Sequence, residues 1–319
     1  MYITYGHRVT SNDDPFMVLA DEVGGALALA GSLGAGLVDF FPILAYLPSW
    51  FPGTYFMNHA RKWEPKLEEM LENPFQDLMK KLNQGSAKPC IVTSQLESLE
   101  RNGGNSIISI GDIKGAARQA YFAGAETTSS VLTVFILAVI LHPECQVKAQ
   151  AELDAVVGPE RLPEFGDRHS LPYLECLLHE TLRQVERFID RIDGKLNAVR
   201  TKAIPHLAVN DDIYRGMFIP KGSLVIGNVR GMSWDEKVYA NPFSFEPTRY
   251  LPAPLGRGEP HPTAHWGFGR RICPGRHLAD SSVWIAMATL LSTLSISKAL
   301  GEDGKEITPE ITFVTSLTR

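Results

Sequence analysis

The pattern of apolar and polar positions along the chain predicts a mainly helical protein. The longest apolar periodic segment runs from Asp112 to Leu141, and Pro143 lies just past its end. Ser109 and Asp112 have the spacing of a capping box, which marks the start of this helix. Amphipathic patterns predict three more helices, over residues 55–83, 144–157 and 171–183.

The segments between these helices carry weaker patterns. Gly, Ser, Asn and Pro punctuate residues 84–106, which favours surface loop. Short strands are expected over residues 214–247, with a turn at Pro220-Lys221-Gly222, and again at the apolar Ile311–Val314. The uncharged run Val23–Val38 has 16 residues and five glycines, which is short of a membrane span. We interpret it as a helix pair that moves or touches lipid.

Composition narrows the class of protein only slightly. The chain has 319 residues, of which 44% are hydrophobic and 21% charged, and this is ordinary for a globular domain. A net charge of −5 gives no reason to expect nucleic acid as a partner. The four cysteines are scattered without zinc spacing, which indicates a reducing compartment rather than a disulfide framework.

One cysteine lies in an unusual setting, in the stretch His265–Asp280. Gly267 and Gly269 permit a tight loop that can approach a flat ligand closely. Pro274 suits a first helical turn, so Cys273 is expected at a helix N-terminus, where the thiolate is favoured. Such a thiolate could be the axial ligand of a haem iron, and neighbouring arginines could pair with propionates. The alternative is a buried structural cysteine. The arginines in question are Arg270, Arg271 and Arg276.

This stretch resembles the haem-binding signature F-x-x-G-x-R-x-C-x-G of the cytochrome P450 monooxygenases. The resemblance assigns Cys273 as the iron ligand and four further residues to haem binding. They are Trp266, Gly269, Arg271 and Gly275. Trp266 stands where the family has Phe, which keeps a ring and adds bulk and an N–H group.

A second resemblance falls within the long helix, at Ala123–Ser130. The segment is similar to the family motif [A/G]-G-x-[D/E]-T-[T/S], which lies over the oxygen-binding face of the haem. It assigns Ala123 and Gly124 to the haem pocket, and it assigns Glu126 and Thr127 to catalysis, where they would organise water for proton delivery. The alternative is a helix with two surface threonines and one exposed glutamate.

Three charged residues resemble the family's ion-paired set. Glu180 and Arg183 match E-x-x-R on one helix face, and Arg249 in FEPTRY matches the second arginine motif. The resemblance implies a buried triad, which requires good geometry and hydrogen bonds to offset desolvation. The alternative is three separate surface charges.

The resemblance implies the P450 fold, a mainly α helical domain with small β-sheets, here incomplete at both ends. We expect one partial domain over residues 1–319. It would hold pocket-roof helices over 1–106, the distal helix to the E-x-x-R helix over 107–183, an atypical insert over 184–203, and the β region, haem-binding loop and following helix over 204–319.

The implied function is that of a fungal haem-thiolate monooxygenase. It would oxidise an apolar, secondary-metabolite-like organic substrate with O2 and electrons from NADPH, using haem b and an NADPH-dependent flavoprotein reductase. The full-length form would associate with the cytoplasmic face of the endoplasmic reticulum.

The chain departs from the family pattern in three places. The N-terminal part with the early W-x-x-x-R haem contact is not found, and residues 184–203 are charged where the family has a Pro-rich segment. The sequence also stops at Arg319, before the family's last strands. The chain therefore looks like a C-terminal fragment, and we expect it not to turn over a substrate. Three alternatives remain: a truncated or misspliced inactive product, a haem protein without monooxygenation, and a cofactor-free interaction module.

Overall fold

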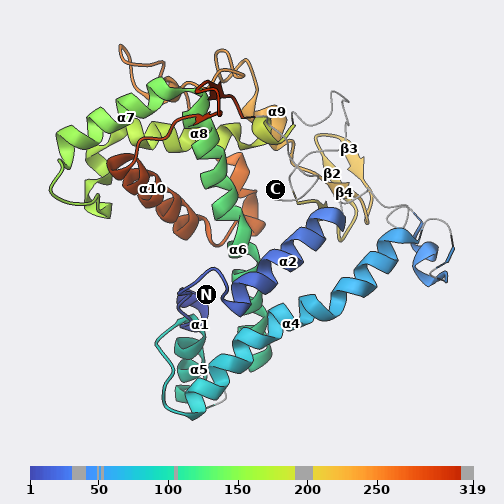
Figure 1. The fold of residues 1–319 in the computed structure, drawn as a ribbon. Coiled ribbons are helices and arrows are strands. Elements are labelled where there is room, and N and C mark those ends of the chain that lie inside the picture. The colour runs from blue at the N-terminus through green and yellow to red at the C-terminus, as the bar shows by residue number, and fades with distance from the viewer. Residues whose placement is uncertain (31–40, 49, 52–53, 104–106, 191–203, 310–319) are drawn as a thin grey trace. The chain divides into compact units, whose positions relative to one another are not determined.

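A computed structural model of the chain describes residues 1–30, 41–48, 50–51, 54–103, 107–190 and 204–309. The fold is mainly helical, with small antiparallel sheets, as predicted (Figure 1). The chain divides into two compact units. Among the described residues, unit 1 holds those up to residue 127, and unit 2 holds those from residue 128 to residue 309. The expectation of one partial domain stays a prediction.

Unit 1 is built from helices whose apolar faces share one core. The core includes Tyr5, Val23, Leu78 and Val92, which are almost completely buried. Its helices are α1 (Tyr2–Tyr5), α2 (Pro15–Ala30), the 3-10 helix η1 (Pro42–Tyr46), α4 (Tyr55–Asn83), α5 (Ile91–Arg101) and the first part of α6 (Ile110–Leu141).

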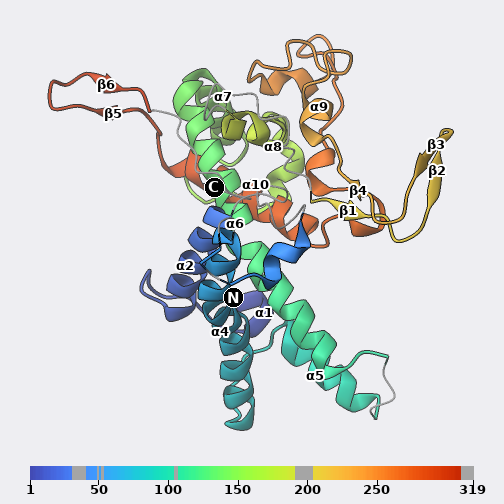
Figure 2. The ribbon, with the colours of Figure 1, turned by 90° about the vertical axis from the view of Figure 1, so that its right-hand side faces the viewer.

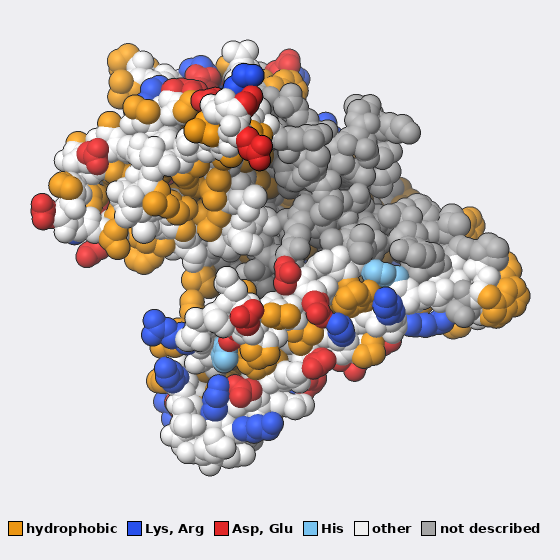
Figure 3. Space-filling view, in the orientation of Figure 1, with side chains coloured by type: hydrophobic (Ala, Val, Ile, Leu, Met, Phe, Trp, Pro, Cys, Tyr) orange, Lys and Arg blue, Asp and Glu red, His pale blue; other side chains and the backbone are white. Residues whose placement is uncertain are grey.

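Helix α4 has the bounds predicted from its amphipathic pattern. Its charged face is exposed, and Figure 3 shows acidic and basic side chains interspersed over α2 and α4. Because charged side chains cover this face of α4, the face contacts water instead of packing in the core.

Helix α5 lies where the sequence favoured surface loop. Its N-terminus is closed by a capping box in which Cys90 N–H donates to Thr93 Oγ1 at 2.9 Å and Thr93 N–H donates to Cys90 Sγ at 3.5 Å. Cysteine is not among the usual N-cap residues, so the start of this helix carried no sequence signal. The neighbouring segments at 84–90 and 102–103 are loop, as expected.

Helix α6 begins at the predicted capping box. Ser109 N–H donates to Asp112 Oδ2 at 2.8 Å, and Asp112 N–H donates back to Ser109 Oγ at 3.2 Å. Ile113 and Ala117 pack in the core of unit 1, whereas Phe135 packs in that of unit 2. Among the described residues, α6 is the helix that is long and apolar enough to cross a membrane, a test that core helices of soluble proteins also pass.

Unit 2 surrounds a core that includes Trp284, Phe135 and Leu174, all without solvent exposure. Its α-helices are the last part of α6, α7 (Pro143–Val156), α8 (Pro172–Asp190), α9 (Val229–Ser233) and α10 (Arg276–Thr293). Short 3-10 helices connect them: η2 (Phe165–Ser170), η3 (Pro247–Tyr250), η4 (Ala264–Trp266) and η5 (Gly269–Arg271).

Six short strands in the described part of unit 2 form three antiparallel pairs. They are β1 (His206–Leu207) with β4 (Leu224–Val225), β2 (Asp212–Tyr214) with β3 (Met217–Ile219), and β5 (Ala299–Leu300) with β6 (Glu306–Ile307). The β2–β3 and β5–β6 hairpins extend away from the helices of this unit (Figure 2). The predicted turn is present, with Gly222 at φ +86°.

Three predictions fall partly or wholly on residues outside the described ranges. The first part of the run 23–38 belongs to α2, and the rest is not described. The predicted strand 311–314 is not described either. Of the segment 184–203, the first seven residues continue α8 to Asp190, beyond the end predicted at residue 183.

Candidate functional site

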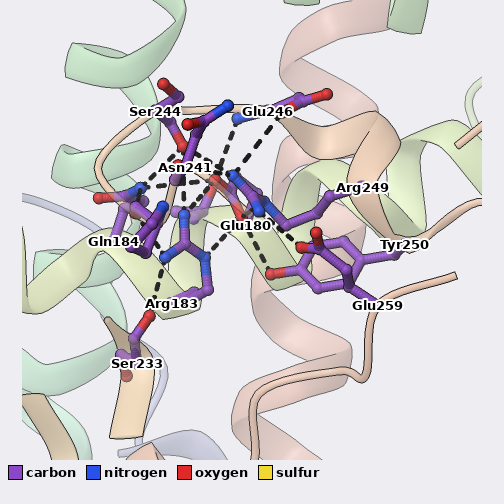
Figure 4. Close-up of polar contacts among 12 residues, drawn as sticks. Glu180, Arg183, Gln184, Ser233, Asn241, Ser244, Glu246, Arg249, Tyr250 and Glu259 are labelled. Atoms are coloured by element: carbon purple, nitrogen blue, oxygen red, sulfur yellow. Dashed lines mark hydrogen bonds and ion pairs between the residues drawn. The ribbon is translucent and has the colours of Figure 1, made fainter. Parts of the chain in front are cut away.

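The structure brings Glu180, Arg183 and Arg249 together in the interior of unit 2 (Figure 4). All three side chains have no solvent exposure. Helix α8 presents Glu180 and Arg183 one turn apart, and η3 supplies Arg249 from the segment that packs on α8. The alternative of three separate surface charges does not hold.

Arg183 binds Glu180 through two parallel hydrogen bonds. Its Nε donates to Oε2 at 2.8 Å and its Nη2 donates to Oε1 at 2.6 Å. The remaining donors reach backbone carbonyls of Ser233 at 2.9 Å and Pro242 at 2.7 Å. Burial alone would lower the pKa of Arg183, but the Glu180 carboxylate raises that pKa above its usual value. Arg183 therefore stays charged and fixes the loop after α9 on α8.

Arg249 lies between two carboxylates. Its Nε is 3.2 Å from Glu180 Oε2, and its Nη1 donates to Glu259 Oε2 at 2.6 Å. Further donors reach the carbonyls of Ala240 and Ser244. A third carboxylate, the half-buried Glu246, lies 3.8 Å from Arg249 Nη2. The two buried arginines are thus paired with the buried carboxylates of Glu180 and Glu259, which meets the requirement that buried charges be paired.

Three members of this network were missed by the sequence analysis. Tyr250 O–H donates to Glu180 Oε2 at 2.9 Å, and Glu259 pairs with Arg249. Gln184, the first residue of the predicted insert, is buried, and its side-chain amide donates to the carbonyls of Pro242 and Ser244, both at 3.1 Å. The available signal was helical spacing, because Gln184 follows Glu180 at i,i+4.

The loop that carries Cys273 has the backbone that its glycines predicted. Gly267 and Gly269 have φ +80° and +57°, the region that side chains resist. Cys273 N–H donates to the carbonyl of Trp266 at 2.8 Å, which closes the loop. Helix α10 begins at Arg276, so Pro274 precedes the helix instead of forming its first turn as predicted. Arg276 N–H still reaches the Cys273 carbonyl, at 3.4 Å.

Cys273 differs from the other cysteines in its exposure. It is partly exposed, whereas Cys90, Cys145 and Cys176 are buried. Burial raises the pKa of the Cys176 thiol to about 12, and nearby Glu152 and Glu175 add to this shift. Cys273 is therefore the thiol best placed to bind an external group, which argues against the purely structural alternative.

The surroundings of Cys273 fit a haem. Phe268 and Leu278 are 41% and 52% exposed, which offers apolar surface, and Arg270 and Arg271 are exposed. A Cβ added at Gly275 would lie 3.9 Å from the Cys273 sulfur, so glycine leaves the thiol uncrowded. Among the described residues, no cluster of three or more His, Cys, Asp or Glu could hold a metal ion.

Three histidines line the loop before Cys273. The rings of His179 on α8 and His261 lie 3.9 Å apart, and His265 lies 4.6 Å from the ring of Trp266. Both ring nitrogens of His265 are buried without a hydrogen-bond partner among the described residues. Burial, with a smaller effect from His179, lowers the pKa of His265 to about 4, so it is neutral at pH 7.

The four residues assigned from the second motif lie in α6, at the end of unit 1, which ends at Thr127. Ala123 and Gly124 are exposed, and a Cβ added at Gly124 would meet only open space. Thr127 is also exposed, and its Oγ1 donates to the Ala123 carbonyl at 2.9 Å. The side chain of Glu126 is outside the described part of the structure. Ala123, Gly124 and Thr127 belong to unit 1, and Cys273 belongs to unit 2.

Comparison with known proteins decides the family. The family model for cytochrome P450 matches residues 1–317. The chain belongs to the cytochrome P450 family. A P450 monooxygenase of Postia placenta is 41% identical over 315 residues, which is 98% of this chain and 57% of that protein. A P450 monooxygenase of Armillaria gallica is 41% identical over 308 residues, covering 97% of this chain and 58% of the relative.

Another relative is the tryptamine 4-monooxygenase of Psilocybe cyanescens, 37% identical over 316 residues, covering 97% of this chain and 59% of that enzyme. The P450 chain described here thus spans less than two thirds of the length of these relatives. Membership of this family implies haem, a redox partner, O2 and an organic substrate.

Proposed function

We propose that the protein containing this chain is a haem-thiolate monooxygenase, with Cys273 as the ligand to a haem b iron. The single observation that carries the proposal is the accessible Cys273 thiol, in a glycine loop closed onto the Trp266 carbonyl. The bound haem would supply the activation of O2 needed to insert one oxygen atom into an organic substrate.

The loop residues have separate roles in this proposal. The Cys273 sulfur would donate electron density to the iron, and Arg271 would pair with a propionate. Gly269 allows the positive φ of the loop backbone, and Gly275 leaves the Cys273 sulfur uncrowded. Together they let a flat ring approach the loop closely. Trp266 covers the loop with a ring, and its carbonyl holds the Cys273 N–H. Ala123 and Gly124 are proposed as haem-pocket residues because they match the family's second motif.

Thr127 and Glu126 are the proposed proton-delivery residues. Thr127 Oγ1 donates a hydrogen bond to the Ala123 carbonyl, so lone pairs on this oxygen remain to accept a hydrogen bond from a water molecule. The Glu126 carboxyl would exchange protons between this water and solvent. The two residues would move protons only when O2 is being reduced.

The electron donor is proposed to be an NADPH-dependent flavoprotein reductase, and the location the cytoplasmic face of the endoplasmic reticulum. Support comes from the fungal P450 relatives and from the cationic loop around Cys273, because exposed Arg270 and Arg271 favour an acidic partner. The substrate class is proposed to be an apolar secondary metabolite. One relative is a tryptamine 4-monooxygenase, so proteins similar to this chain include one that is named for a small organic substrate.

The experiment is a haem titration of the 319-residue chain, followed by the ferrous–CO spectrum. Stoichiometric haem and the red-shifted Soret band of thiolate ligation are expected. A band at the unshifted position of imidazole ligation would overturn the proposal. Absence of haem binding would instead favour an interaction module without cofactor.

A further inference from the structure

The charge balance of the buried network depends on a residue outside the Glu180, Arg183 and Arg249 set. Two guanidinium groups around one carboxylate leave a net positive charge, and all three side chains lack solvent exposure. An uncompensated buried charge is strongly destabilising. Glu259 supplies the nearer and more deeply buried compensating charge, through Oε2 at 2.6 Å from Arg249 Nη1 (Figure 4). The Glu246 carboxylate is 35% exposed and lies farther away, at 3.8 Å from Arg249 Nη2.

Glu259 is held on both carboxylate oxygens. Its Oε1 accepts the backbone N–H of Ala240 at 3.0 Å and Nε of Arg257 at 2.7 Å. The side chain is only 8% exposed, whereas that of Arg257 is 38% exposed. Burial would raise the pKa of Glu259, but Arg257 and Arg249 together lower it below the usual value. The carboxylate is therefore charged at neutral pH.

Glu259 also fixes the start of the segment that leads to Cys273. Its backbone N–H donates to the Arg249 carbonyl at 3.0 Å, and the preceding Gly258 N–H donates to the Leu251 carbonyl at 2.8 Å. Two residues after Glu259, His261 packs edge-on against Tyr250, with ring centroids 5.3 Å apart. The chain then passes through His265 to the Cys273 loop. Glu259 thus joins the ion-pair network to the stem of that loop.

We propose that Glu259 is a positioning residue for Cys273. Its carboxylate neutralises Arg249 and anchors the stem of the loop, and it thereby sets the fraction of protein in which the Cys273 sulfur binds iron. This inference rests on the proposed function, in which Cys273 is the haem ligand.

The test compares Glu259→Gln with Glu259→Asp and with Glu302→Gln, a matched control at an exposed glutamate. The first readout is hydrogen exchange of residues 260–275 in the haem-free chain. The second is the fraction of bound haem whose ferrous–CO Soret band is red-shifted by thiolate ligation, called here the thiolate share. It is recorded at a temperature at which each variant is folded. A purely structural role would change the unfolding temperature without changing this share.

Glu259→Gln should lower the unfolding midpoint by about 10 °C, because it leaves Arg249 partly unpaired. It should speed exchange in residues 260–275 by about tenfold and reduce the thiolate share. Glu259→Asp keeps the negative charge, so its exchange rate and thiolate share should be close to those of the parent. This variant keeps the test decisive if Glu259→Gln does not fold. Glu302→Gln should match the parent.

Two results would overturn the inference. The first is that Glu259→Gln has the same hydrogen-exchange rates and the same thiolate share as the parent chain. The second is that Glu259→Gln has a lower unfolding midpoint than the parent but an unchanged thiolate share. Failure of the proposed function is distinguishable, since the parent chain itself would then lack the thiolate band while the exchange readout still tests the anchoring of the stem.

Discussion

At the scale of single residues, position decides which side chains can act. Cys273 and Cys176 are the same residue type, yet one is partly exposed in a loop and the other is buried on α8. The motif spacing identified Cys273 from sequence, because several fixed positions match together. Glu259 could not be identified, because it lies in a Pro/Gly-rich loop without periodicity, and its pairing with Arg249 depends on tertiary contacts.

Thr127 is tested by Thr127→Ala. The variant is made in the full-length enzyme, because the 319-residue chain is not expected to turn over a substrate. If the Thr127 hydroxyl delivers protons, the variant should divert NADPH-derived electrons to hydrogen peroxide, and product formed per NADPH should fall by about tenfold or more. The measurement is the ratio of peroxide released to NADPH consumed with the reductase present. Thr133→Ala is the matched control, because Thr133 makes the same back-bond to Ser129 on the same helix, at 3.0 Å. Equal ratios in both variants would remove Thr127 from the mechanism.

His265 predicts a pH dependence of stability. Its pKa is about 4 in the folded chain against 6.5 usually, so the unfolded chain binds more protons between these values. The free energy of unfolding should be fully retained above pH 6.5 and should fall as the pH drops from 6.5 toward 4. Urea unfolding across this range measures the slope.

His265→Phe removes this titration but keeps a ring beside Trp266, so its slope between pH 6.5 and 4 should be shallower than that of the parent. The lowered pKa of His261 contributes in the same direction and remains in both proteins. Identical slopes in parent and variant would show that His265 does not titrate as described.

At the scale of elements, local sequence signals predicted the helices well and their ends less well. The capping box of α6 and the bounds of α4 followed from caps and periodicity. Helix α5 was missed because its cap is a cysteine, and α10 starts after Pro274 because the loop bond from Cys273 N–H to Trp266 directs the chain. Helix α8 continues past residue 183 because Gln184 finds buried carbonyl partners.

The Cys273 loop is tested as an element by Gly267→Ala. At φ +80° an added Cβ is strained, so the variant should lose about 1–2 kcal/mol of unfolding free energy and retain less haem. Denaturant unfolding and haem retention are the measurements. Gly166→Ala is the control, because Gly166 lies in the same unit without a positive φ and has open space around it. The loop assignment would be contradicted by equal stability and haem retention in both variants.

At the scale of the whole molecule, family membership follows from a match along residues 1–317. The fold class and the order of motifs were predictable from sequence, because the motifs combine local spacing with a fixed chain order. The relation of α6 residues to Cys273 was not predictable, because it depends on how units 1 and 2 are placed. The central claim therefore rests on unit 2, where the ion-paired network and the thiol loop lie in one compact unit.

The most direct test of that claim is the ferrous–CO spectrum of Cys273→Ser beside that of Cys176→Ala, both in the haem-loaded chain. The buried Cys176 thiol has a pKa of about 12, so its removal should leave the spectrum unchanged. Cys273→Ser should abolish the red-shifted Soret band, because the variant has lost the thiolate ligand. A red-shifted band that persists in Cys273→Ser would contradict the account and show that another residue binds the iron.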